Sequence, residues 1–109
     1  MSNNQLKNLI IKIFVKHKLK KLHATICAKA ILNAELVGAP SHGLSRLKMY
    51  CERISKKVIN PRPKIKIKNI SKSISMIDAN NSIGFVAADM GIKKTIKNAK
   101  ETGIGLVGI

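Results

Sequence analysis

Aromatic residues are scarce in this chain: tryptophan is absent, and the aromatic content is one tyrosine and two phenylalanines. Any hydrophobic core must therefore be built mainly from isoleucine, leucine, valine, alanine and methionine. The hydrophobic fraction of 45% over 109 residues is enough for the modest core of one small domain. We therefore expect a globular chain and not a disordered one.

Acidic residues are also few, with 5 against 21 lysines and arginines, which gives a net charge of +16. A strongly basic chain by default favours an anionic partner such as nucleic acid or a membrane surface. However, only three of the basic residues are arginine, the planar side chain that readers of bases and phosphates prefer. The lysines are scattered, and lysine, isoleucine and asparagine together fill 44 of 109 positions. Compositional drift is favoured, and a small basic nucleic-acid- or anion-binding module is the alternative.

Candidate metal ligands and disulfide partners are few. Cys27 and Cys51 lie on predicted helices among apolar neighbours, where cysteine usually behaves as a small buried hydrophobe. His17 and His23 lie in basic sequence without a carboxylate or thiolate at ligand spacing, and we expect both on the surface. Neither a disulfide nor a metal site is expected.

Long apolar runs are missing. The N-terminus carries polar residues before an interrupted apolar stretch, and no run approaches the roughly 18 apolar residues of a membrane span. These features predict a cytoplasmic protein with no membrane partner.

Apolar residues at the spacing of one helical face predict three helices in the first half of the chain. The first covers residues 4–17, and a second, after a basic connector, ends near Gly38. Ser41 can cap a third helix over residues 43–56. The apolar positions of the third helix are Leu44, Leu47, Cys51 and Ile54.

The second half predicts strands and one more helix. Lys64–Lys68 alternates lysine with isoleucine, which is typical of a half-exposed strand, and Ser73–Ile77 is its expected antiparallel partner. A fourth helix stops at Gly103, and Ile104–Ile109 follows as a buried strand. The apolar face of the fourth helix is formed by Phe85, Ala88, Ile92, Ile96 and Ala99.

These elements define an α+β fold class, with N-terminal helices followed by a β-hairpin, a helix and a final strand. We expect a helical N-terminal domain over residues 1–60, and the start of an α/β domain over residues 61–109. The sequence stops in or directly after its last strand, which would be an unusual end for a complete domain, so we expect a truncated one.

One set of polar residues could carry chemistry. His42, Arg46 and Tyr50 are spaced four residues apart and share one stripe if the third helix forms. Arginine pairs bidentately with a carboxylate, while a neighbouring histidine exchanges a proton with a hydroxyl or carbonyl oxygen. The set, with Ser41 adding a hydrogen bond, suits a small 2-hydroxy or 2-oxo acid. A solvated helix face is the alternative, which spacing alone favours.

The sequence provides no cofactor-binding pattern of its own. Gly103, Gly105 and Gly108 match no phosphate-cradling loop, because no strand-to-helix turn follows them. We assign these glycines no cofactor role, and the sequence alone indicates no cofactor-binding residues.

The order Ser41-His42-Gly43, Arg46, Tyr50, Glu52-Arg53-Ile54 and Asn60-Pro61 resembles the N-terminal signature of the type-2 malate/L-lactate dehydrogenases. Further positions look like the stretch that leads into the cofactor domain of that family. These positions are Gly84, Val86-Ala87-Ala88, Met90-Gly91, Ile96, Ala99, Gly103 and Val107-Gly108-Ile109.

The resemblance implies a non-Rossmann fold, a homodimer and an NAD(P)-dependent oxidoreductase. Such an enzyme acts on the CH–OH group of a small 2-hydroxy acid of the ureidoglycolate, malate or lactate type. The resemblance also implies that His42 is the catalytic proton donor or acceptor and that Ser41, Arg46 and Tyr50 contact substrate. The cofactor would be NAD or NADP.

Two departures from the family pattern stand out. Phe85 occupies a position where members usually carry glutamine. The sequence also stops just before the segment that supplies a second functional histidine and most of the nicotinamide contacts. Because the protein must orient the cofactor against substrate, we expect an N-terminal fragment that is inactive alone.

Overall fold

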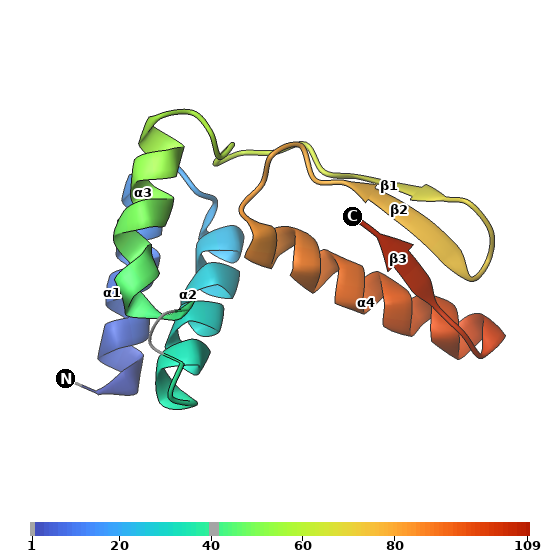
Figure 1. Cartoon of the computed structure of the whole chain (residues 1–109), viewed down its shortest axis with the longest axis horizontal. Coiled ribbons are helices and arrows are strands. Elements are labelled where there is room, and N and C mark those ends of the chain that lie inside the picture. The colour runs from blue at the N-terminus through green and yellow to red at the C-terminus, as the bar shows by residue number, and fades with distance from the viewer. Residues whose placement is uncertain (1, 40–41) are drawn as a thin grey trace. The chain divides into compact units, whose positions relative to one another are not determined.

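The computed structural model describes residues 2–39 and 42–109 (Figure 1). Over these residues the chain is mixed α and β, which confirms the predicted class and order of elements. The helices are α1 (Asn3–Lys16), α2 (Lys21–Leu36), a 3₁₀ turn η2 (Leu44–Arg46), α3 (Leu47–Ser55) and α4 (Gly84–Thr102). The strands are β1 (Lys66–Asn69), β2 (Ile74–Asp78) and β3 (Leu106–Gly108).

The chain divides into two compact units, Met1–Arg62 and Pro63–Ile109. The first contains α1, α2, η2 and α3, and the second contains the three strands and α4.

The helices of the first unit begin and pack for local reasons. Ser2 Oγ accepts a hydrogen bond from the Gln5 amide at 3.1 Å, and Gln5 Oε1 accepts one from the Ser2 amide at 2.8 Å. This capping box fixes the start of α1. The core between α1 and α2 is small and aliphatic apart from one phenylalanine. Its fully buried members are Ile10, Phe14, Ala24, Cys27, Ala28 and Ile31.

The three α-helices of this unit all end in the same hydrogen-bonded motif. After α1, the Leu19 amide donates to the Phe14 carbonyl at 3.1 Å, and the Lys18 amide donates to the Val15 carbonyl at 2.9 Å. Such a Schellman motif needs a left-handed residue, usually glycine, just after the helix. Gly38 fills that position after α2 with φ of 78°, but lysine fills it after the other two helices. These are Lys18, with φ of 76°, and Lys57, with φ of 62°.

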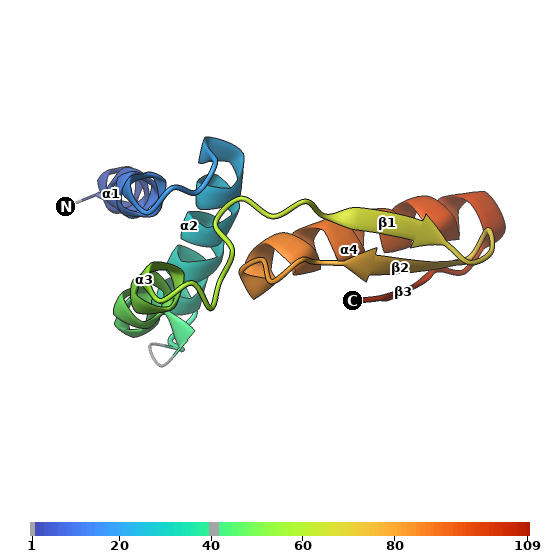
Figure 2. The same ribbon diagram turned by 90° about the horizontal axis from the view of Figure 1, so that it is seen from above.

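The second unit is built on a three-stranded sheet in the order β1-β2-β3, with α4 along it (Figure 2). β1 and β2 form the predicted antiparallel hairpin, with Lys66 opposite Asp78. β3 pairs in parallel with β2, with Ile74 opposite Leu106. The left-handed Gly103, with φ of 87°, ends α4 and turns the chain back toward the sheet.

The predicted burial of this unit is wrong at three places. All four residues of β1 are exposed, so the strand is not half-buried. Leu106 in β3 is 62% exposed, because β3 lies at an edge of the sheet. On α4 the predicted apolar face is largely open, with Ile92 61% and Ile96 49% exposed. The residues that α4 buries are instead Val86, Ala87, Gly91 and Asn98.

A polar chain crosses the buried side of this unit. Ser75 on β2 is fully buried, and its hydroxyl donates to Asn69 Oδ1 at 2.9 Å. The Asn98 amide nitrogen on α4 donates to Ser75 Oγ at 3.0 Å. Asn98 is 3% exposed, so both partners are satisfied out of contact with water. The hairpin and α4 are therefore joined by directional bonds as well as by apolar contact.

Candidate functional site

The residues predicted to carry chemistry lie around the turn between α2 and α3. Ser41, the proposed substrate contact and helix cap, lies outside the described residues. His42 is exposed, and its backbone amide donates to the Ala39 carbonyl at 3.0 Å. Arg46 and Tyr50 are half-buried and belong to the first unit, as His42 does.

The third helix does not begin where the sequence predicted. Residues Leu44–Arg46 form the 3₁₀ turn η2, and α3 starts only at Leu47. The Arg46 amide donates to the Gly43 carbonyl at 3.0 Å, an i to i+3 bond of this tighter turn. His42 therefore precedes the α-helix, and the uninterrupted helical stripe predicted for His42, Arg46 and Tyr50 is wrong.

Glu35, which sequence reasoning missed, contacts this turn. Its Oε1 atom accepts a hydrogen bond of 2.7 Å from the Leu44 backbone amide. Gly43, which precedes Leu44 and lies against the Glu35 side chain, is buried. The only signal in the sequence was an acidic residue on a predicted helix, in a chain with few acidic residues. That signal does not reveal that its partner is the Leu44 amide, nine residues further along the chain.

The predicted buried face of α3 is only partly formed. Ile54 is 7% exposed, whereas Leu44, Leu47 and Cys51 are half-buried. Cys27 and Cys51 are free thiols, and burial raises the pKa of Cys27 to about 12. Burial also raises the pKa of Cys51. Both thiols are thus held in the protonated, unreactive form near neutral pH.

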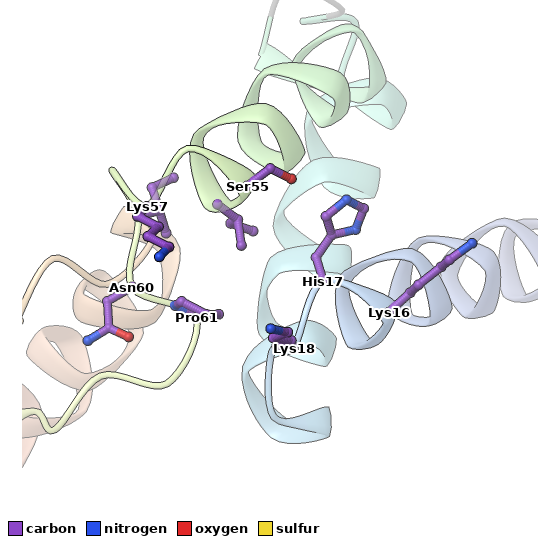
Figure 3. A pocket seen from close by; sticks show the side chains of 9 residues that line it. Lys16, His17, Lys18, Ser55, Lys57, Asn60 and Pro61 are labelled. Carbon is purple, nitrogen blue, oxygen red and sulfur yellow. The ribbon is translucent and has the colours of Figure 1, made fainter.

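A cavity of about 570 Å³ lies at the opposite end of α3 from His42 (Figure 3). Its walls come from the ends of α1 and α3 and the segment that follows α3, and three lysines contribute to it. The lining residues are Lys16, His17, Lys18, Ile54, Ser55, Lys57, Ile59, Asn60 and Pro61. The nine residues of α3 would separate the two ends by about 13 Å, so the cavity is not part of the His42 turn.

The two other histidines were predicted to be surface residues, but neither is fully exposed. His17 is half-buried, and its Nδ1 atom is hydrogen-bonded to the Ile13 carbonyl at 2.9 Å. His23 is also half-buried, and desolvation lowers its pKa, with a further contribution from the Lys20 charge. No cluster of three potential metal ligands occurs in residues 2–39 and 42–109.

The glycines near the C-terminus serve packing within the second unit. A Cβ atom on Gly105 would meet the backbone of Thr95, with its carbonyl carbon 3.1 Å away. A Cβ atom on Gly108 would lie 2.6 Å from Met76 Sδ. Gly105 thus permits a close approach to α4, and Gly108 permits a close approach of β3 to β2.

Two comparisons identify the group of proteins to which these features belong. The family model for malate/L-lactate dehydrogenase matches residues 1–109. The chain belongs to the malate/L-lactate dehydrogenase family. A malate dehydrogenase structure from Pyrococcus horikoshii superposes with a TM-score of 0.94 and 34% identity, over 98% of this chain and 31% of that one.

Curated members of the malate/L-lactate dehydrogenase family give the same result. A malate/(S)-sulfolactate dehydrogenase from Methanothermus fervidus is 38% identical over all 109 residues, which are 32% of its length. The ureidoglycolate dehydrogenase (NAD(+)) of Escherichia coli K12 is 35% identical over all 109 residues, which are 31% of its length. The chain thus spans about a third of these relatives, and similar identities do not single out one substrate.

No helix in the part of the chain that the structure describes is long and apolar enough to cross a membrane.

Proposed function

We propose that this chain supplies the substrate-binding segment of an NAD(P)-dependent oxidoreductase that acts on the CH–OH group of a small 2-hydroxy acid. The match of residues 1–109 to the malate/L-lactate dehydrogenase family carries the proposal, because this range includes the entire candidate site. Relatives named for malate, sulfolactate and ureidoglycolate support a small hydroxy acid as the substrate class.

Each candidate side chain has a role that its chemistry allows. His42 takes the proton from the 2-hydroxyl oxygen during oxidation and returns it in the reverse direction. Arg46 pairs with the substrate carboxylate, and the charge-assisted bidentate geometry fixes the orientation of the acid. Ser41 and Tyr50 complete the contacts by hydrogen bonds to substrate oxygens.

The remaining features of the proposal concern the rest of the enzyme. Residues 1–60 form the helical domain, and residues 61–109 begin the domain that binds NAD or NADP. The enzyme works as a cytoplasmic homodimer. Because the chain spans only about a third of the length of its relatives and the protein must orient the cofactor against substrate, we propose that the 109 residues alone do not turn over substrate.

Binding and turnover are tested on the 109-residue chain. We expect L-malate to shift the NMR resonances of His42, Arg46 and Tyr50, and Arg46→Lys to weaken binding by about tenfold because the bidentate pair is lost. Arg62→Lys, an exposed position in the same unit, is the matched control and keeps wild-type affinity.

Two results would contradict these statements separately. The substrate role would fail if L-malate, sulfolactate and ureidoglycolate all left these three resonances unchanged at tens of millimolar. Formation of NADH or NADPH by the 109 residues with any of these acids would refute the proposed inactivity of the chain alone.

A further inference from the structure

A carboxylate from another helix holds the turn that carries His42. Glu35 lies in the last turn of α2 (Lys21–Leu36), and its Oε1 atom accepts the Leu44 amide proton over 2.7 Å. Hydrogen bonds to a charged group are shorter and roughly twice as strong as neutral ones. This contact therefore joins the end of α2 to the first residue of η2, across the segment that contains His42.

The bond replaces a cap that the turn itself lacks. The first N–H groups of a helical turn have no partner within it and need one from outside. Gly43 precedes η2 and has no side chain to cap the turn. The Glu35 carboxylate fills this role, although it belongs to another helix.

Gly43 makes room for this arrangement. A Cβ atom at residue 43 would lie 2.7 Å from Glu35 Cγ and 2.8 Å from Glu35 Cδ, well inside van der Waals contact. The φ angle of Gly43 is −103°, so left-handed geometry is not the reason for a glycine. The close approach of Glu35 is the reason.

Electrostatics also indicate that Glu35 has a specific partner. The chain has 21 lysines and arginines for 5 acidic residues. The ion pairs of lysines within residues 2–39 and 42–109 are Lys48–Glu52 and Lys93–Asp89, so no lysine there pairs with Glu35. The Glu35 carboxylate is directed to a backbone amide instead of to one of the many available lysines.

We propose that Glu35 is a positioning residue that fixes the Gly43–Leu44 backbone and thereby places His42 for proton exchange with the substrate. The proposal rests on the proposed function of His42, but its structural part does not. Glu35 touches neither substrate nor reacting atoms, and it acts through the backbone of the turn.

The first test compares variants of Glu35 in the 109-residue chain by NMR. Glu35→Ala should accelerate hydrogen exchange of the Leu44 amide by about tenfold or more, since the bond to a charged acceptor is lost. It should also increase the mobility of the His42 amide, measured by ¹⁵N relaxation. Glu35→Gln keeps an acceptor oxygen and should restore most of the order. Glu52→Ala, an exposed acidic position on α3, should change neither amide.

The second test is a double-mutant cycle on the contact itself. Gly43→Ala should raise the equilibrium constant for unfolding by about tenfold in the wild-type chain, because the new methyl group forces the Glu35 side chain to move and give up its bond to the Leu44 amide. In a Glu35→Ala background the same change should cost less than about threefold, because the obstructing carboxylate is absent.

The outcomes separate the two proposals. Faster exchange at Leu44, a more mobile His42, rescue by glutamine and a non-additive cycle support positioning by Glu35. Unchanged Leu44 exchange and His42 mobility in Glu35→Ala, or an additive cycle, overturn it. None of these measurements needs substrate, so a failed malate titration would remove the proposed function and leave this result intact.

Discussion

Replacing Lys18 or Lys57 with glycine should stabilise the first unit. Both lysines occupy the left-handed position of a Schellman motif, with φ of 76° and 62°. A side chain in that conformation brings Cβ too close to the neighbouring carbonyl oxygen, and only glycine avoids the contact. The native chain therefore carries strain at the ends of both α1 and α3.

The expected gain is the difference between two opposing free-energy changes. Relief of left-handed strain contributes about 1–2 kcal/mol to the free energy of unfolding. The greater freedom of glycine in the unfolded chain removes about 0.4–1 kcal/mol of that. Each substitution should therefore raise the free energy of unfolding by about 0.5–1 kcal/mol, or the melting temperature by about 2–8 °C for a unit of this size.

Thermal and urea unfolding followed by circular dichroism would measure this gain. Lys12→Gly is a matched control, because it removes the same charge from the exposed side of α1 and should destabilise by about 0.7 kcal/mol. Lys18→Ala removes the charge but keeps the strain, so it should not stabilise. A Lys18→Gly variant that is less stable than wild type, or no more stable than Lys18→Ala, would refute the reasoning.

Three more predictions concern packing in the second unit and the two thiols. Gly105→Ala should destabilise by about 2 kcal/mol in urea unfolding, because its Cβ atom meets the fixed backbone of Thr95. Gly84→Ala, with nothing within 4 Å, should be neutral or slightly stabilising, and equal costs would contradict this account. In the folded chain a thiol reagent should modify Cys51 well before Cys27, and equal rates would be contrary to the burial described above. Because folding raises the pKa of Cys27 from 9.0 to about 12, the contribution of this thiol to stability should be complete below pH 9 and be lost as pH rises toward 12, so Cys27→Ala should make the alkaline decline in stability shallower.

Local patterns predicted most of the elements of this fold correctly. The left-handed glycines after α2 and α4 and the alternation through Lys64–Lys68 depend on neighbours in the sequence. Helix and hairpin positions could therefore be located within a few residues. Periodicity also favoured a third helix, but it could not show that the first turn is 3₁₀, because the Leu44 amide is bound by Glu35 from another helix.

Burial was harder to predict, for a related reason. Hydrophobic periodicity finds the more apolar side of a helix, and on α4 that side carries the exposed Ile92 and Ile96. The side that packs on the sheet has Gly91 and Asn98, small or polar residues that fit a close approach. Which side packs depends on shape and hydrogen bonding between elements, which a single helix does not encode.

The buried bond between Ser75 and Asn98 limits how the hairpin can assemble. Adjacent residues of a strand face opposite sides, so a slip of one position would turn Ile74 or Met76 toward α4 and Ser75 toward solvent. That slipped hairpin would bury apolar side chains but would leave the Asn98 amide without its partner, at a cost of about 1–3 kcal/mol. The slip would also turn Ile77, now 4% exposed, toward solvent. The bond between Ser75 and Asn98 therefore adds a directional preference for the observed alignment of the hairpin on α4.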